Sequence, residues 1–97
     1  MSDMFHLRRD MGCTRAEFMS WLPGATRQAP LQIDGDVVTI SAQGGSVQIT
    51  LKEKLPRRIG SVALPVLEIN FCFCGLDDMT RDAFLAYFDL YTRRGGG

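Results

Sequence analysis

Long hydrophobic runs, excess charge of one sign, histidine and cysteine are all scarce in this 97-residue chain. No apolar stretch approaches the ~18–20 residues that a membrane helix needs, so we expect no membrane-spanning segment. Eleven Lys and Arg residues balance eleven Asp and Glu residues. Zero net charge argues against a dedicated nucleic-acid binder, which gains much of its affinity from a basic face. We therefore expect neither a membrane nor a nucleic acid as partner.

The three cysteines are too few for a disulfide scaffold, which fits a reducing compartment. The first residues also lack the cationic and apolar segments of a secretory signal. We therefore expect a cytoplasmic protein. Its length fits a single domain over residues 1–94, followed by a disordered glycine tail at 95–97. Residues 1–12 fit a short strand, a helix or a flexible segment, and the pattern leaves these alternatives open.

A helix is predicted to begin after Thr14. The Thr14 hydroxyl and the Glu17 carboxylate have the spacing of a capping box, in which each satisfies a free amide of the first turn. Cys13 and Phe18 then flank the first turn as a hydrophobic staple. Pro23 is expected to end this helix after about two turns.

From Leu31 to Lys52 the chain alternates between apolar and polar residues, as strands do. We predict two-residue turns at 34–35 and 44–45, with a short extra strand at 31–33. Both turns place the same apolar set on one face of a sheet. This set consists of Leu31, Ile33, Val38, Ile40, Ala42, Val47, Ile49 and Leu51.

Residues 53–61 are predicted to form a connector, since Pro56 and Gly60 interrupt the pattern. A long strand follows, in which the odd positions from 67 to 73 are apolar and face the core. Before Pro65 the apolar positions are even instead, so we expect a bulge or bend at Pro65 to restore the alternation.

The last helix is predicted to begin at Asp77 or Asp78, either of which caps the first turn. An aromatic stripe formed by Phe84, Tyr87, Phe88 and Tyr91 has helical spacing and can cover a sheet. The chain is therefore predicted to be an α+β two-layer sandwich in α-β-β-β-α order. Its antiparallel sheet has three main strands, and both helices lie on one face.

The Cys72-Phe73-Cys74 sequence places two thiols on the polar face of the long strand. Two thiolates and the Glu68 carboxylate favour a soft metal, zinc or copper, and a redox pair is a second chemical interpretation. The structural alternative is that both are small residues near a strand end. The only histidine is His6, and the acidic pairs fall at predicted turns and caps, so catalysis is less expected than binding.

A basic run from Lys52 to Arg58 precedes an acidic stretch from Glu68 to Asp89, which makes the chain dipolar. We therefore expect a small accessory or interaction protein that binds a protein partner, or itself as a homodimer, through the polar sheet face or a strand edge. The residues predicted to contact the partner are Asn70, Cys72, Cys74, Val66, Arg57 and Arg58.

Overall fold

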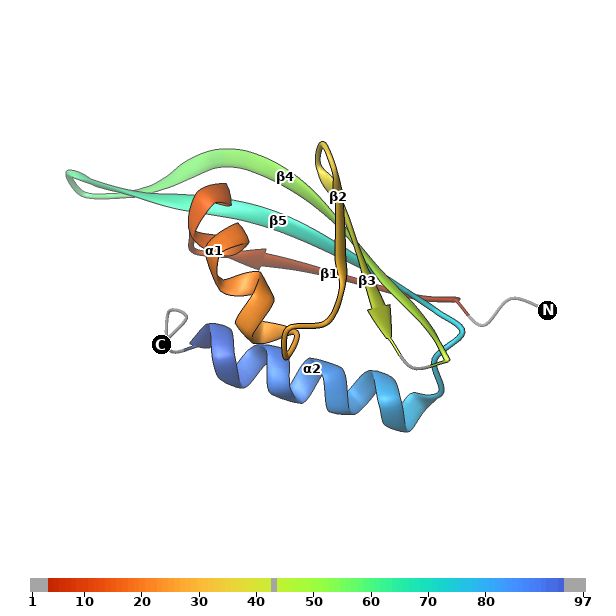
Figure 1. Cartoon of the computed structure of the whole chain (residues 1–97). Helices are drawn as coiled ribbons and strands as arrows, with labels where there is room; N and C mark the ends of the chain where they lie inside the picture. Colours follow the sequence, from red (N-terminus) through yellow and green to blue (C-terminus); the bar gives the residue numbers. More distant parts are fainter. Residues whose placement is uncertain (1–3, 43, 94–97) are drawn as a thin grey trace.

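The computed structural model describes residues 4–42 and 44–93 and has two layers, a sheet and a pair of helices (Figure 1). The elements in chain order are β1 (Met4–Met11), α1 (Arg15–Ala25), β2 (Leu31–Asp34), β3 (Val37–Ala42), β4 (Gly45–Ile59), β5 (Val62–Cys74) and α2 (Asp78–Arg93). The strands form one antiparallel sheet in the order β1-β5-β4-β3-β2, and both helices lie on one face of it. The α+β prediction is confirmed, but the sheet has five strands rather than three main ones and a short extra one.

The core lies between this sheet and α2 and is rich in phenylalanine. The odd residues of β5 from Leu67 to Phe73 are at most 1% exposed, as their alternation predicts. Phe71 stacks on Phe73 at 5.7 Å between ring centroids and meets Phe88 of α2 edge-on at 5.3 Å. Aromatic contacts of this kind fill the space between sheet and helix.

The additional strand comes from the segment that the sequence leaves open. β1 pairs antiparallel with β5, with Met4 opposite Cys74 and Met11 opposite Leu67. Phe5 and Leu7 alternate with His6 and Arg8, as expected for a strand with one face on a core. Residues 4–11 therefore form an edge strand of the sheet, next to β5.

Both predicted turns are displaced by one residue. Gly35 and Asp36 connect β2 and β3, so Ile33 pairs with Val38 rather than with Asp36. Gly35 has a φ of 62°, which suits a glycine in the first position of a tight hairpin turn. In the second hairpin Ala42 pairs with Gly45, and Val38 faces Ile49 rather than Leu51. Each correction moves the partner by two residues, so the apolar side chains stay on the predicted face.

Helix α1 begins as predicted but does not end at Pro23. Thr14 accepts from the Glu17 amide at 3.1 Å, and the Glu17 carboxylate accepts from the Thr14 amide at 2.8 Å. The helix continues through Pro23 to Ala25 because the proline removes only one internal hydrogen bond. Gly24 lies so close to Tyr91 of α2 that a Cβ there would overlap the tyrosine ring.

Helix α2 is capped by Asp77, whose carboxylate accepts from the Thr80 amide at 2.7 Å. Phe88 is buried, and Phe84, Tyr87 and Tyr91 are half-buried, as predicted for the aromatic stripe. The glycine tail at 95–97 lies outside the described residues.

None of the helices within residues 4–42 and 44–93 has the length and apolar character needed to cross a membrane.

The predicted connector at 53–61 is instead part of β4, which pairs with β5 to the turn at Gly60 and Ser61. The register shifts between Lys54 and Arg57, so the irregularity lies on β4 opposite Pro65 rather than within β5. Pairing with β5 satisfies the backbone hydrogen-bonding groups of these residues, although their side chains are poor strand formers. The result is a hairpin that projects beyond the rest of the sheet (Figure 1).

Candidate functional site

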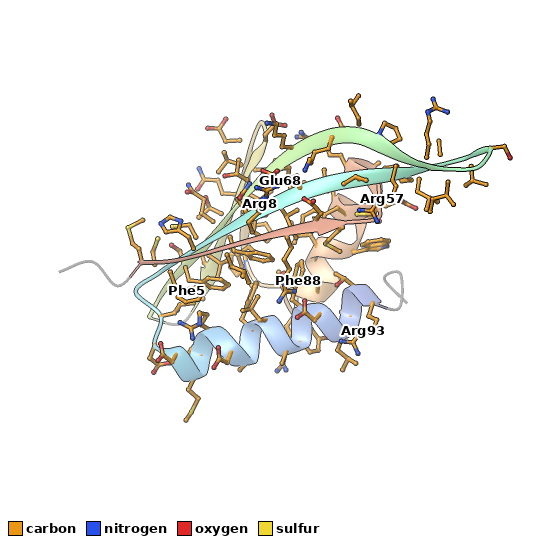
Figure 2. All side chains as sticks on the ribbon, turned by 180° about the vertical axis from the view of Figure 1, so that it is seen from behind. Phe5, Arg8, Arg57, Glu68, Phe88 and Arg93 are labelled. Atoms are coloured by element: carbon orange, nitrogen blue, oxygen red, sulfur yellow. The ribbon has the colours of Figure 1, made fainter. Side chains whose placement is uncertain are left out.

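The projecting part of the hairpin consists of residues 54–66, and we call it the arm. The neighbouring strands stop before it, since β3 reaches only to Thr50 of β4 and β1 only to Leu67 of β5. Every residue from 54 to 64 is exposed. The arm contributes to an elongated shape, 48 × 28 × 24 Å, and Figure 2 labels Arg57 on it.

The arm carries apolar side chains in the open. Leu55 is 90% exposed, Ile59 59%, Val62 54% and Leu64 43%. Ile59 pairs directly with Val62, and Leu64 pairs with Arg57. Because opposite residues share a face of a sheet, Ile59, Val62 and Leu64 lie together on the side away from the core, while Leu55 lies within the register shift between Lys54 and Arg57. The reversed alternation before Pro65 is therefore real, and no bulge in β5 turns these side chains inward.

The charges of the arm are all positive. It contains Lys54, Arg57 and Arg58 and no acidic residue. Lys54 lies 3.5 Å from Asp10 and 3.9 Å from Glu68 at the base of the arm. Among the ion pairs of the described residues, none involves Arg57 or Arg58. Both guanidinium groups are therefore available to an acidic partner.

A row of half-buried residues continues from the arm along the outer face of β5. The row consists of Val66, Glu68, Asn70, Cys72 and Cys74. Arg57 pairs with Leu64 on the same face as this row. The row and Arg57 together contain all the residues that were predicted to contact a partner, except Arg58. Arg58 pairs with Ala63 on the opposite face of the arm.

Glu68 is part of an ion-pair network within this row. It lies 3.2 Å from Arg8 of β1 and accepts a hydrogen bond from Asn70 at 2.9 Å (Figure 2). The Asn70 hydrogen bond lowers the pKa of the Glu68 carboxyl, and the nearby Arg8 and Lys54 add to this effect. Glu68 and Cys72 are four residues apart on a strand, or about 13 Å. This separation places Glu68 away from the thiols with which it was predicted to bind a metal.

The two thiols themselves lie together. The Sγ atoms of Cys72 and Cys74 are 3.6 Å apart, and both side chains are half-buried. Burial raises the pKa of the Cys72 thiol, and the adjacent Cys74 raises it further. A raised pKa disfavours a nucleophilic thiolate at neutral pH. No three of the His, Cys, Asp and Glu side chains in the described ranges are placed to hold a metal as they stand.

His6 lies beside this pair, which the sequence does not predict. It is directly opposite Cys72, while Met4 is opposite Cys74. The sequence does contain an indication of this position. Residues 4–8 alternate, and in a strand this alternation places Met4 and His6 on the polar face. The third cysteine, Cys13, lies in the core on the other face.

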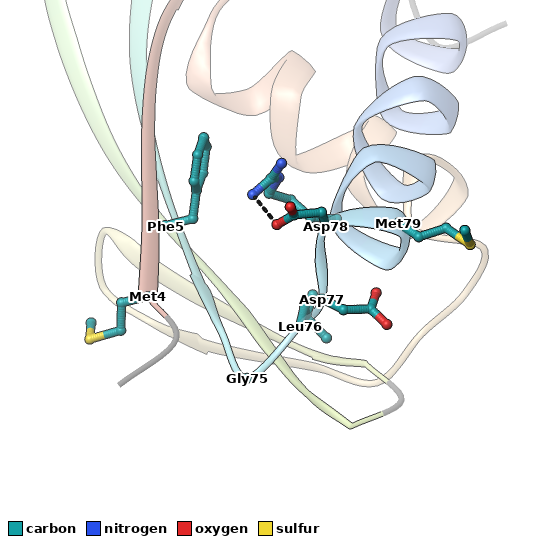
Figure 3. Close-up of a pocket in the computed structure, with 8 residues that line it drawn as sticks. Met4, Phe5, Gly75, Leu76, Asp77, Asp78 and Met79 are labelled. Atoms are coloured by element: carbon teal, nitrogen blue, oxygen red, sulfur yellow. Dashed lines mark hydrogen bonds and ion pairs between the residues drawn. The ribbon is translucent and has the colours of Figure 1, made fainter. Parts of the chain in front are cut away.

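A hollow of about 790 Å³ lies at the other end of the molecule from the arm (Figure 3). Its charged groups already have partners. Asp77 caps α2, and Arg81 pairs with Asp78 at 3.1 Å while its guanidinium lies 4.0 Å from the centre of the Phe5 ring. These contacts give the predicted acidic pair Asp77 and Asp78 structural roles. The remaining lining residues are Met4, Gly75, Leu76 and Met79.

Comparison with known proteins gives no match to a family model, a curated protein or a solved structure. The function of this chain is therefore inferred from its own residues.

Proposed function

We propose that this chain is a small interaction protein that binds a protein partner through the arm and the adjoining outer face of β5. The observation that carries the proposal is the group of four exposed aliphatic side chains on a hairpin that projects from the sheet. An exposed apolar cluster costs solubility, and such clusters commonly mark interaction sites. The arm is therefore better suited to contact another molecule than to support its own fold.

The chemistry of the arm favours a partner with an apolar centre and an acidic rim. Leu55, Ile59 and Val62 supply apolar area, Arg57 supplies positive charge on the face of Ile59 and Val62, and Arg58 supplies it on the opposite face of the arm. Protein interfaces have this arrangement of a dry centre within a polar rim. A single-stranded nucleic acid would instead favour aromatic side chains on which bases stack, and residues 54–66 include no aromatic residue.

A partner of opposite charge suits the arm better than a second arm. Two copies joined arm to arm would bring six cations together without an acid, and Pro56 and Pro65 have no amide hydrogen to donate across a new strand pair. Proline and positive charge on an exposed strand are known to prevent pairing between edges. A homodimer through the arms is therefore the less favoured form of this proposal.

The proposal is tested by comparing two equally exposed apolar residues at opposite ends of the molecule. Leu55→Glu changes the arm, and Met79→Glu is the control, since Met79 is 82% exposed on α2. Purified tagged protein is used to capture partners from a cell extract at low and high salt. We expect a partner retained by the wild type and by Met79→Glu, lost with Leu55→Glu and weakened by salt.

Capture that is the same for both variants contradicts the proposal. So does binding of the wild type to duplex DNA or to anionic vesicles that is lost with Leu55→Glu, because the arm would then serve a different class of partner. Sedimentation velocity of the wild type over a range of concentrations separates self-association from binding to another protein.

A further inference from the structure

We propose that Cys72 and Cys74 form a binding site for one copper(I) ion, with a third donor from β1. This inference is independent of the arm. The thiols lie at the end of β5 that is far from the β4–β5 turn, and they are brought together by the strand itself.

The separation of the two sulfur atoms suits a single ion. A metal–sulfur bond of ~2.3 Å allows one ion to bridge two sulfurs that are up to ~4.6 Å apart. The observed separation of 3.6 Å falls within this limit and gives a bent angle at the ion. A bent arrangement leaves room for a third donor, which the neighbouring strand supplies.

The third donor is Met4, because His6 and the two thiols do not form a group of three that could hold a metal within the described residues. Directly opposite residues of an antiparallel pair have Cα atoms ~4.5–5.5 Å apart and side chains on the same face. Met4 is opposite Cys74, and His6 is opposite Cys72. Figure 3 shows Met4 projecting from β1 to the side away from Phe5. Its pairing with Cys74 places Met4 on the face that carries the thiols. The Met4 thioether is therefore attached to the residue directly opposite Cys74, on the face that carries both sulfurs.

The surroundings favour copper(I) over zinc. On the other side of the pair, β4 presents Ser46 opposite Cys74 and Gln48 opposite Cys72, both uncharged. Zinc sites use three or four protein ligands, and the described His, Cys, Asp and Glu residues form no group of three that could hold a metal. Thiolates and thioethers are soft donors that select copper(I), which accepts fewer ligands.

Binding exchanges protons for the metal. Copper(I) and two thiols give a copper(I) bis-thiolate and two protons, and no electron is transferred. Both thiols must lose their protons, so the affinity rises with pH. We expect it to rise about tenfold per pH unit for each proton released.

The test uses full-length reduced protein without oxygen and offers copper(I) alone in competition with a chromophoric copper(I) chelator. We expect one ion per chain, with a thiolate-to-copper absorption band in the ultraviolet. Cys72→Ser and Cys74→Ser should each weaken binding at least 100-fold. Cys13→Ala is the matched control and should leave the affinity unchanged. Met4→Leu should weaken binding three- to tenfold, and His6→Gln should leave the affinity unchanged.

Alkylation of the wild-type cysteines followed by mass spectrometry tests the site without variants, which would have to fold to be informative. Copper(I) should protect Cys72 and Cys74 together. The proposal is overturned if less than a tenth of an ion binds per chain, if Cys72→Ser binds as tightly as the wild type, or if zinc(II) at equal concentration displaces copper(I).

Discussion

The central sheet and the arm are made from the same two strands, yet they differ in almost every physical respect. Between Leu67 and Phe73, β5 has a helix on one face and a strand at each edge, and its inward side chains are at most 1% exposed. Between residues 54 and 64 the same hairpin is surrounded by solvent, and its apolar side chains are exposed. Strand formation alone therefore does not bury a side chain.

Charge divides the molecule in the same way. The arm carries three cations and no acid, so the remainder of this neutral chain has a matching negative excess. In the packed part, the charges are used in local contacts, such as Arg8 with Glu68. In the arm, Arg57 and Arg58 take part in none of the ion pairs among the described residues. We therefore expect stability to depend on the packed part and binding to depend on the arm.

The largest expected effect is in the centre of the core. Phe71→Ala removes a ring that contacts both Phe73 and Phe88, and it should lower the free energy of unfolding by about 3–5 kcal/mol. Urea denaturation followed by circular dichroism measures this change. A loss below about 1 kcal/mol would show that the packed part is far less tightly packed than its burial indicates.

The second effect concerns pH and the buried Cys13. Burial raises the pKa of its thiol from an ordinary value of 9.0 to about 11, and the Glu17 carboxylate adds to the shift. The unfolded chain therefore loses this proton more readily than the folded chain does. The contribution of Cys13 to stability is complete below pH 9 and is lost as the pH rises toward 11.

This loss should amount to about 2 kcal/mol in the wild type. Urea denaturation at several pH values between about 8 and 10.5 measures it. Cys13→Ala provides the control, since it lowers stability at every pH but should flatten the alkaline decline. An equally steep decline in Cys13→Ala would mean that another group is responsible.

A smaller effect is expected at the start of α1. Thr14→Ala removes the hydroxyl that accepts from the Glu17 amide, and it should cost about 1 kcal/mol. Thr14→Ser keeps the hydroxyl and should remain close to the wild type. Thermal unfolding of the two variants measures the difference, and equal melting temperatures for Ala and Ser would contradict the role of the cap.

The smallest effect is expected in the arm. Leu55→Ser replaces the most exposed large apolar side chain and should change the free energy of unfolding by no more than about 0.5 kcal/mol. The same denaturation experiment as for Phe71→Ala measures it. A loss comparable with that of Phe71→Ala would contradict the expectation that stability depends on the packed part and not on the arm.

Much of the packed part could be predicted because the alternation of apolar and polar residues assigns the same face even when the pairing of the strands is predicted two residues off. Both hairpin turns were predicted one residue away from their observed positions, and the apolar face was nevertheless correct, since each pairing error was two residues. The capping box of Thr14 and Glu17 is a local feature and was found without tertiary information. The predicted end of α1 was wrong because Pro23 removes only one internal hydrogen bond and the helix continues to Ala25.

The candidate sites could be predicted only in part. The thiol pair was visible as two cysteines at strand spacing, but the proximity of His6 depended on β1 being a strand next to β5. The arm was predicted to be a connector, because Lys, Pro and Arg are poor strand residues. Its backbone hydrogen bonds to β5 outweigh those preferences, and its apolar side chains gain nothing from burial within this chain.

The sequence by itself determined which face of the central sheet is apolar, where α1 begins and that two thiols share a face. These properties depend on spacings of two to four residues, which the backbone geometry of strands and helices enforces. Only the tertiary structure decided the pairing of β1 with β5, the length of α1 and the projection of the arm. Each of these depends on contacts between residues far apart in the chain, where local spacing carries no information.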